Sequence, residues 1–392
     1  MIPSHQAFHT YCLRKLKGRI EKRAATLSHL TGCYNVTGPQ PMRLVSPLLK
    51  HAVYPALHRI GWLNRMMPPG GYAVANYHGV VPSDHTDADI FLDGNLVHPE
   101  VLRQQLQFLK AHYHVIHPEE FRASIDQGKA LPPRSVLVTC DDGLLNVLTD
   151  MLPVLQSVGV TCLFFVTGAS CGKSPGMLWY EELYRLMHIK PLGELESQLP
   201  LEENSKSQAA ETFQSLWWNT VRRASRLDAT ARARWMDLVR SHRDPSRVFQ
   251  SERRWQLLGI AELKHLAQAG MSIGAHTLTH PILSLCSEDE ARREIQESKH
   301  AIEEALGRNV WAFAYPFGNP ATMGDREVRL AREAGFSCGF LNVEHRRVEP
   351  RGAGRSGAFT LPRTHVSQDT RLPEFAAHLS GLHSRLQRAI GG

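Results

Sequence analysis

The segment Val136-Leu-Val-Thr-Cys-Asp-Asp-Gly143 joins a short apolar run to two adjacent carboxylates and a glycine. Pro132 and Pro133 precede it, and a short apolar run bounded by such residues is typical of a buried parallel strand. Aspartates are rarely buried without a partner, so two of them at the end of a buried strand indicate a site rather than a core. We therefore expect Asp141 and Asp142 to be functional residues.

Predicted strands and helices alternate on both sides of this segment. Before it, the apolar patterns predict strands at 72–78 and 114–116 and helices at 98–112 and 118–127; after it, they predict a helix at 145–158 and a strand at 161–166. The alternation resumes after 260, with helices at 261–269, 288–306 and 325–334, strands at 270–276, 310–315, 335–340 and 359–366, and a C-terminal helix. Such alternation predicts a parallel sheet or barrel.

The alternation of strands and helices is interrupted between 173 and 256, where the sequence is helix-prone and charged. We interpret this part as a helical insertion. Five of the seven tryptophans of the chain lie in it: Trp179, Trp217, Trp218, Trp235 and Trp255. Aromatic side chains can line a sugar groove. We favour a helical core for them instead, because tryptophans at helical spacing usually pack together.

Residues 1–70 are predicted to form an N-terminal helical extension, followed by a domain over 71–392 that the insertion interrupts. The segment 48–67 reads as an amphipathic helix kinked at Pro55. Such a helix either packs on the main domain or lies on a membrane surface, and we favour packing.

Composition narrows the function classes. The 392 residues are 42% hydrophobic, which supports a sizeable core. The seven cysteines are scattered without a Cys-x-x-Cys pair, which argues against a disulfide framework and a structural zinc module. Because no apolar stretch is long enough to span a bilayer and the first ten residues lack the order of a secretory signal, we expect a cytoplasmic location.

The net charge of +7 is densest in one basic run, formed by Arg14, Lys15, Lys17, Arg19, Lys22 and Arg23. Such a run can meet nucleic acid or an anionic membrane. Basic runs are also common on solvated helix faces, which is the interpretation we favour. We expect no nucleic-acid partner, and a peripheral contact with the inner membrane through the N-terminal helices stays open.

Three of the predicted strands end in polar or turn residues, namely Asp141-Asp142-Gly143, His276-Thr-Leu-Thr-His280 and Tyr315-Pro-Phe-Gly318. In barrels built from strand-helix units, the carboxyl ends of the strands form the rim that holds the active site. We therefore expect these three segments to converge in space.

His276 and His280 are four residues apart, so on one helical turn or in a tight loop both imidazoles can face one ion. Two histidines and a carboxylate with an open fourth position form the pattern of a catalytic zinc, which lowers the pKa of bound water towards about 7. The alternative is a pair of histidines that are ordinary surface or core residues.

The two aspartates are expected to have different roles. Neighbouring residues at a strand end point in different directions, so one carboxylate can bind a metal while the other serves as general base. The same geometry argues against a glycosidase, whose two carboxylates must face each other across a bond. Cys140 lies inside the strand without an evident base, and we interpret it as a core residue.

The three strand-end motifs resemble, in order, those of the polysaccharide deacetylases, the NodB-type domains of carbohydrate esterase family four: Thr139-Cys-Asp-Asp-Gly143 (T-F-D-D-G), His276-Thr-Leu-Thr-His280 (H-[ST]-x-x-H) and Phe313-Ala-Tyr-Pro-Phe-Gly318 (F-A-Y-P-[YF]-G). The segments Asn76-Tyr-His-Gly-Val80 and Leu361-Pro-Arg-Thr-His365 also recur in such relatives. The similarity covers about 72–167 and 261–366.

This resemblance implies a distorted (β/α) barrel with one divalent metal, usually zinc; the ligand set also accepts cobalt, nickel or iron. It implies that Asp142, His276 and His280 bind the metal and that Asp141 is the general base. It also implies that the backbone N–H of Phe317 helps to hold the oxyanion.

The sequence departs from the family pattern at two places. Many members carry an arginine in the third motif that tethers the catalytic aspartate, whereas Phe313 or Ala314 stands here; Arg363 is the candidate substitute. The general acid of the family is a late histidine, and His365 is the nearest candidate. Because Arg363 and His365 are two apart on a predicted strand, both can face the barrel interior.

The function implied by the resemblance is metal-dependent hydrolysis of N-acetyl groups on an amino-sugar glycan, which is a polysaccharide, an oligosaccharide or a lipid-linked sugar. One alternative is an O-acetyl esterase or non-sugar amidase on the same scaffold. A second alternative is a catalytically inert glycan-binding protein, against which the retained aspartates and histidines argue.

Overall fold

The computed structural model describes the following residues: 47, 49–65, 71–82, 93–172, 176–200, 212–242, 255–343 and 357–391. The basic run at 14–23 lies outside these residues, as do Cys12 and Cys33. The five cysteines within them are unpaired thiols. None of the helices in these ranges combines the length and the apolar character that crossing a bilayer requires.

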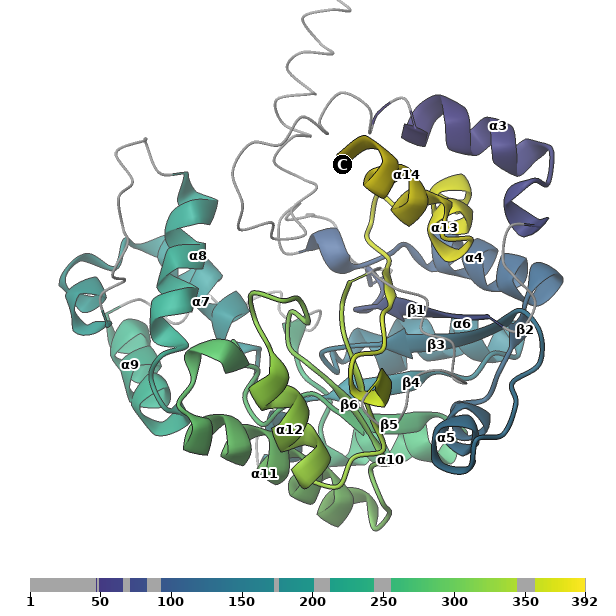
Figure 1. Ribbon diagram of the computed structural model, residues 1–392. Helices are drawn as coiled ribbons and strands as arrows, with labels where there is room; N and C mark the ends of the chain where they lie inside the picture. Colours follow the sequence, from purple (N-terminus) through teal and green to yellow (C-terminus); the bar gives the residue numbers. More distant parts are fainter. Residues whose placement is uncertain are drawn as a thin grey trace, which may run out of the picture.

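An eight-stranded parallel sheet forms the centre of the described structure (Figure 1). Its strands are β1 (Tyr72–Tyr77), β2 (His114–Val115), β3 (Ser135–Cys140), β4 (Leu163–Val166), β5 (Ser272–Ala275), β6 (Ala312–Ala314), β7 (Cys338–Phe340) and β8 (Thr364–His365). They are ordered β7-β6-β5-β4-β3-β1-β8, and β2 pairs with the first residues of β3 outside this path.

The sheet curls back onto itself through the segment 361–365. Thr364 of β8 pairs with Ala75 of β1, while Leu361 forms a parallel bridge with Phe340 of β7. This segment therefore joins the two ends of the strand path and closes a distorted barrel. The predicted fold class is confirmed, although the strand expected at 359–366 is reduced to two residues after a 3-10 turn at Gly357–Phe359.

Helices surround the barrel: α4 (Pro99–His112), α5 (Pro118–Gln127), α6 (Leu152–Val158), α10 (Ile260–Gln268), α11 (Glu288–Leu306) and α12 (Asp325–Glu333). Local signals fix their ends. For α11, the Ser287 hydroxyl accepts a hydrogen bond from the Glu290 backbone N–H at 3.2 Å, and Gly307 ends the helix with a φ of 65°. The structure thus reproduces the predicted span 288–306.

Side chains alternate between the two faces of the strands. In β3, Val136, Val138 and Cys140 pack against the surrounding helices, whereas Leu137 points into the barrel. The interior cluster includes Val74, Leu137, Leu163, Phe165, Ala312, Ala314, Phe340 and Leu361. Because the period is two, Asp141 follows Leu137 and Thr139 on the interior face, so that a polar layer lies beyond the apolar one.

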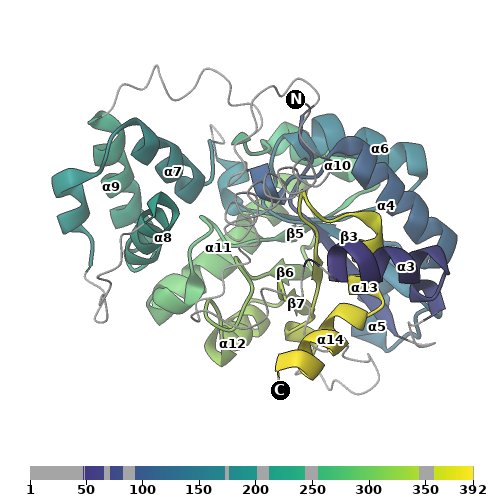
Figure 2. The same ribbon diagram turned by 90° about the horizontal axis from the view of Figure 1, so that it is seen from above.

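The helices α7 (Trp179–Ile189), α8 (Phe213–Ala224) and α9 (Ala229–Ser241) lie together on one side of the barrel, away from α13 (Leu372–Leu379) in both views (Figures 1 and 2). They enclose a hydrophobic cluster of their own, in which Trp179, Trp217, Trp235 and Trp255 are buried. The interpretation as helical core therefore holds for these four tryptophans. Trp218 is half-buried.

The described part of the N-terminal region packs on the C-terminal helices. A π-helical turn, η2 (Leu49–Val53), leads into α3 (Tyr54–Arg59), so the irregularity falls just before Pro55. Lys50 Nζ lies 2.8 Å from Oε1 of Glu374. The single C-terminal helix that we expected is wrong: Gly381, with a φ of 70°, separates α13 from α14 (Leu382–Gly391).

Candidate metal centre

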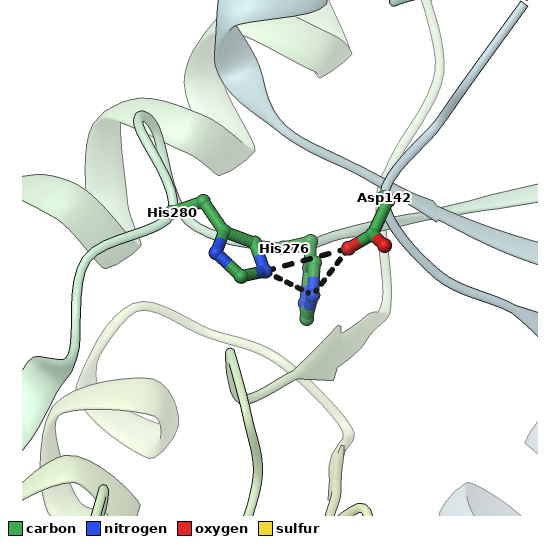
Figure 3. A group of neighbouring side chains, drawn as sticks. All are labelled: Asp142, His276 and His280. Atoms are coloured by element: carbon green, nitrogen blue, oxygen red, sulfur yellow. Dashed lines mark hydrogen bonds and ion pairs between the residues drawn. The ribbon is translucent and has the colours of Figure 1, made fainter. Parts of the chain in front are cut away.

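Two strands deliver the candidate metal ligands to the same rim of the barrel. Asp142 lies two residues beyond the end of β3, and His276 directly follows β5. His280 comes from the loop after β5. The three side chains point toward one another (Figure 3), and all three are buried. The predicted convergence of these two strand ends is therefore present.

The separations of the three ligand atoms suit one small cation. His276 Nε2 lies 3.2 Å from His280 Nε2, and Oδ1 of Asp142 lies 3.6 and 3.4 Å from these two nitrogens. Tetrahedral zinc binds nitrogen and oxygen at about 2.0–2.1 Å, which corresponds to ligand–ligand edges of about 3.3–3.4 Å. The three atoms thus fit three corners of such a tetrahedron, and among the described residues no fourth histidine, cysteine or carboxylate joins the group.

A hydrogen bond from the second ring nitrogen of His276 fixes the tautomer of this ligand. His276 Nδ1 lies 2.7 Å from the carbonyl oxygen of Ala314, which can only accept a hydrogen bond. Nδ1 therefore carries the proton, and Nε2 presents its lone pair to the centre. Burial lowers the pKa of His280 despite the opposing carboxylate of Asp142. A neutral imidazole is the form that binds a metal.

The Asp142 carboxylate is held in its charged form. Burial raises the pKa of this group, but the contacts with His276 and His280 outweigh burial and hold the pKa well below its ordinary value. The site therefore offers one negative oxygen and two nitrogens, the donor set that zinc and similar divalent ions prefer.

Backbone strain is concentrated at this rim. Four of the five non-glycine residues with positive φ in the described part of the chain lie here: Asp142, Thr277, His280 and Phe317, with φ between 60° and 73°. Such conformations cost about 1–3 kcal/mol each and persist where the surroundings enforce them. The His276–His280 segment is thus a tight loop and not a helical turn, and Thr277 Oγ1 accepts the His280 backbone N–H at 3.0 Å.

Asp141 faces the barrel interior and meets Arg363. Nη1 and Nη2 of Arg363 donate to Oδ1 and Oδ2 of the carboxylate at 2.7 and 2.6 Å, and Asn76 Nδ2 donates to Oδ2 at 3.0 Å. The guanidinium is 1% exposed and lies over the ring of Phe165. Burial raises the pKa of Asp141, but the Arg363 charge and hydrogen bonds outweigh burial, so the net shift is downward.

Residues 227–339 match a family model described as polysaccharide deacetylase. The resemblance read from the three motifs is thereby confirmed. The matched part holds His276, His280 and Phe317, whereas Asp141 and Arg363 lie outside it.

Individual proteins match this chain at low identity. The YxkH protein of Bacillus subtilis (strain 168), named as a polysaccharide deacetylase, is 25% identical over 122 residues, which are 31% of this chain and 40% of that protein. This chain thus spans less than half of that relative's length. Two solved structures match at a TM-score of 0.48. The deacetylase PplD of Streptococcus pyogenes in complex with acetate is 18% identical and covers 80% of this chain and 99% of its own; IcaB from Ammonifex degensii is 19% identical and covers 79% and 97%.

The rim that holds the candidate metal ligands also contains residues to which sequence reasoning assigned no role. Asn76, at the interior face of β1, accepts hydrogen bonds at Oδ1 from Thr139 and Arg363, both at 2.9 Å, while its Nδ2 holds Asp141. The signal was present in the sequence, because Asn76-Tyr-His-Gly-Val80 follows the same pattern of a strand ending in polar residues.

Two histidines adjoin the Asp141 side of the candidate metal centre. The rings of His78 and His365 meet edge to face, with centroids 4.9 Å apart. Nε2 of His78 lies 3.9 Å from Oδ2 of Asp141. His365, predicted as the general acid, therefore adjoins Asp141 through His78, a residue for which sequence reasoning predicted no role.

Phe317 lies on the opposite side, against the histidine loop. Its ring centroid is 5.0 Å from that of His280, 5.6 Å from Tyr180 of α7 and 5.3 Å from Trp218 of α8. These three half-buried aromatic side chains, Phe317, Tyr180 and Trp218, form an aromatic wall beside the candidate metal ligands. Two of its members come from the predicted insertion, so sequence position alone could not place them at the site.

Proposed function

We propose that this protein hydrolyses the N-acetyl groups of an amino-sugar glycan. The observation that carries the proposal is the convergence of Asp142, His276 and His280 beside a second carboxylate, Asp141, that arginine holds in its charged form. A divalent metal site next to a separate base is an arrangement that supports metal-assisted hydrolysis of an amide.

In this proposal Asp142, His276 and His280 hold one divalent cation, for which zinc is the first candidate and cobalt or nickel the alternatives. When bound, the cation supplies Lewis-acid polarisation at the open position. His276 is held in the correct tautomer by the Ala314 carbonyl, so this chain provides the orientation of its ligands as well as the ligands themselves.

Asp141 is the proposed general base. Its ionised carboxylate accepts a proton from the water that attacks the acetyl carbonyl carbon. Arg363 and Asn76 fix both carboxylate oxygens, so the group is oriented before substrate arrives. Acid–base assistance of this kind typically contributes 10²–10⁴-fold to the rate, about 3–5 kcal/mol of barrier.

The remaining steps need a donor for the oxyanion and an acid for the amine. The backbone N–H of Phe317 is the proposed oxyanion donor. The positive φ of Phe317, 60°, supports this role, because a backbone conformation that the surroundings enforce also fixes the direction of the N–H group. His365, beside His78, is the proposed source of the proton that the leaving nitrogen gains as the C–N bond breaks. The products are acetate and a free amine.

The aromatic wall supports a sugar as the substrate. The faces of pyranose rings carry C–H groups, which pack on flat aromatic surfaces. Tyr180 and Phe317 both contact His280, so a ring packed on the wall lies beside the reacting group.

The test is acetate release from a panel containing N-acetylglucosamine oligomers, O-acetylated xylan and an acetyl-lysine peptide, with and without a chelator and after zinc or cobalt is added back. We expect release from the first substrate alone, lost with chelator and restored by metal. Release from xylan or the peptide instead would favour the esterase or amidase alternative. Binding of the oligomers without any release would favour an inert glycan-binding protein.

A further inference from the structure

The loop that carries His280 is held from outside the barrel by two helices of the predicted insertion. From α7, Trp179 Nε1 donates a hydrogen bond to the carbonyl oxygen of His280 at 3.2 Å. From α9, Arg232 reaches the neighbouring residue, Thr279. The guanidinium carbon of Arg232 also lies 5.2 Å from the centroid of the Trp179 ring. The two contacts are therefore parts of one assembly.

Arg232 is at the centre of a buried polar network. Its Nη2 donates to Oγ1 of Thr279 and lies 3.4 Å from Oε1 of Glu294, on α11. Glu294 in turn accepts the backbone N–H of Thr279 at 2.8 Å and the Thr279 hydroxyl. Arg232 and Glu294 are 2% and 1% exposed. Glu294 thus binds Thr279 at its backbone and at its hydroxyl, Arg232 binds the hydroxyl as well, and both charged side chains are buried.

We propose that Arg232 is a positioning residue for the metal centre, acting through Thr279 on the imidazole of His280. The proposal rests on the metal site proposed above. The physical reason is that His280 adopts a strained backbone conformation, with a φ of 60°, which its surroundings must enforce. Removing a residue that orients a metal ligand without binding the metal itself typically lowers metal affinity 10- to 100-fold.

The competing explanation is that Arg232 only fastens α9 to α11. A fastening role would lower the stability of the protein but leave the metal affinity of the folded protein unchanged. Metal affinity and the visible absorption spectrum of bound Co²⁺, which reports ligand geometry, therefore separate the two roles. Neither measurement depends on turnover.

The experiment titrates the folded full-length protein with Co²⁺ and follows its visible absorption, for the wild type and for Arg232→Met. The matched control is Arg223→Met. Arg223 lies on α8 in the same predicted insertion, has a side chain 13% exposed, and donates to Glu196 Oε1 at 3.0 Å and to the Leu199 and Pro200 carbonyl oxygens at 3.0 and 2.8 Å. A second variant, Thr279→Val, removes the hydroxyl link while keeping the charge pair, and serves if Arg232→Met does not fold.

We expect Arg232→Met and Thr279→Val to bind Co²⁺ at least about tenfold more weakly than wild type, with an altered absorption spectrum, and Arg223→Met to match wild type. Equal affinity and spectra in wild type and Arg232→Met, or in Thr279→Val where the arginine variant does not fold, would overturn the positioning role. An equal loss in the Arg223→Met control would also overturn it. If wild type itself binds no Co²⁺, the proposed metal site fails and the inference fails with it.

Discussion

Arg363 and Asp141 form a two-pronged ion pair across the barrel interior, although 222 positions separate them in the chain. The third motif of this chain lacks the arginine that many relatives carry there, and Arg363 pairs with Asp141 instead. In β6, Phe313 packs outward against the helices and Ala314 points inward, so the interior position is occupied by a methyl group. The guanidinium that pairs with Asp141 comes instead from Arg363, near the far end of the chain.

Replacing Arg363 with methionine should lower kcat by about 10² or more and change KM little, because the proposed base loses its orientation rather than its contact with substrate. Removing one partner of a buried pair should also cost about 3–5 kcal/mol of unfolding free energy. Steady-state kinetics and urea unfolding measure the two effects. Arg363→Lys should recover little, since an ammonium cannot bind both oxygens. An unchanged kcat in Arg363→Met would count against this assignment of Asp141.

Substitutions of the two adjacent aspartates should have different effects on metal binding and on catalysis. Asp142→Asn should lose bound zinc, because a neutral amide replaces the charged ligand. Asp141→Asn should keep zinc and lose about 10²–10⁴-fold in kcat. Elemental analysis of the purified variants measures the bound zinc, and acetate release measures kcat. Zinc retained in Asp142→Asn and lost in Asp141→Asn would reverse the proposed roles.

The assignment of the general acid can be tested at His365. If this histidine protonates the leaving amine, His365→Ala should lose the basic limb of the pH–rate profile and about 10²-fold in rate. The profile of kcat/KM between pH 5 and 10 is the measurement. An unchanged basic limb would remove His365 as the acid and transfer the role to its neighbour, so His78→Ala is the companion variant.

Gly318 should tolerate no side chain. It has a φ of 47°, and an added Cβ would lie 2.4 Å from the backbone nitrogen of Asn342, so the segment carrying Phe317 would have to shift. We expect Gly318→Ala to cost about 2–3 kcal/mol in urea unfolding and to reduce activity. Gly335→Ala is the control, because its φ is 80° but no atom of the described residues lies within 4 Å of an added Cβ, and about 1 kcal/mol is expected. Equal costs would show that the contact with Asn342 is unimportant.

Stability should depend on pH through Glu374. Burial raises the pKa of this group, but its contacts with His378 and Lys50 outweigh burial, so the folded pKa lies below the ordinary value of 4.5. A depressed pKa stabilises the folded state above the unfolded pKa, and this contribution is lost as the pH falls through the folded pKa. Glu374→Gln should therefore unfold about 1–3 kcal/mol more easily at pH 7 and resemble wild type more closely near pH 3.5. Urea unfolding at both pH values is the measurement, and an equal difference at the two would contradict the assignment.

Much of the fold was predictable because it depends on local rules. Parallel strands end at one rim, and side chains alternate with a period of two. These rules predicted that the two aspartates and His276 lie at one rim and that the two aspartates point in different directions, whereas the assignment of the metal to Asp142 came from the resemblance to the deacetylases. They do not say which residue lies across the barrel, so the partner of Asp141 could only be proposed. The contribution of α7 and α8 was also out of reach, since Tyr180 and Trp218 meet Phe317 only once the helices have packed on the barrel.

The segment that closes the barrel, residues 361–365, also carries Arg363, and this sets the order in which a nascent chain can complete the site. The residues of β1 and β3 are synthesised first, but the Asp141 carboxylate has no Arg363 guanidinium to pair with until residues 361–365 emerge and join β7 to β1. The proposed base is therefore among the last parts of the molecule to be completed, and a polypeptide interrupted before that point would possess the metal ligands without an oriented base.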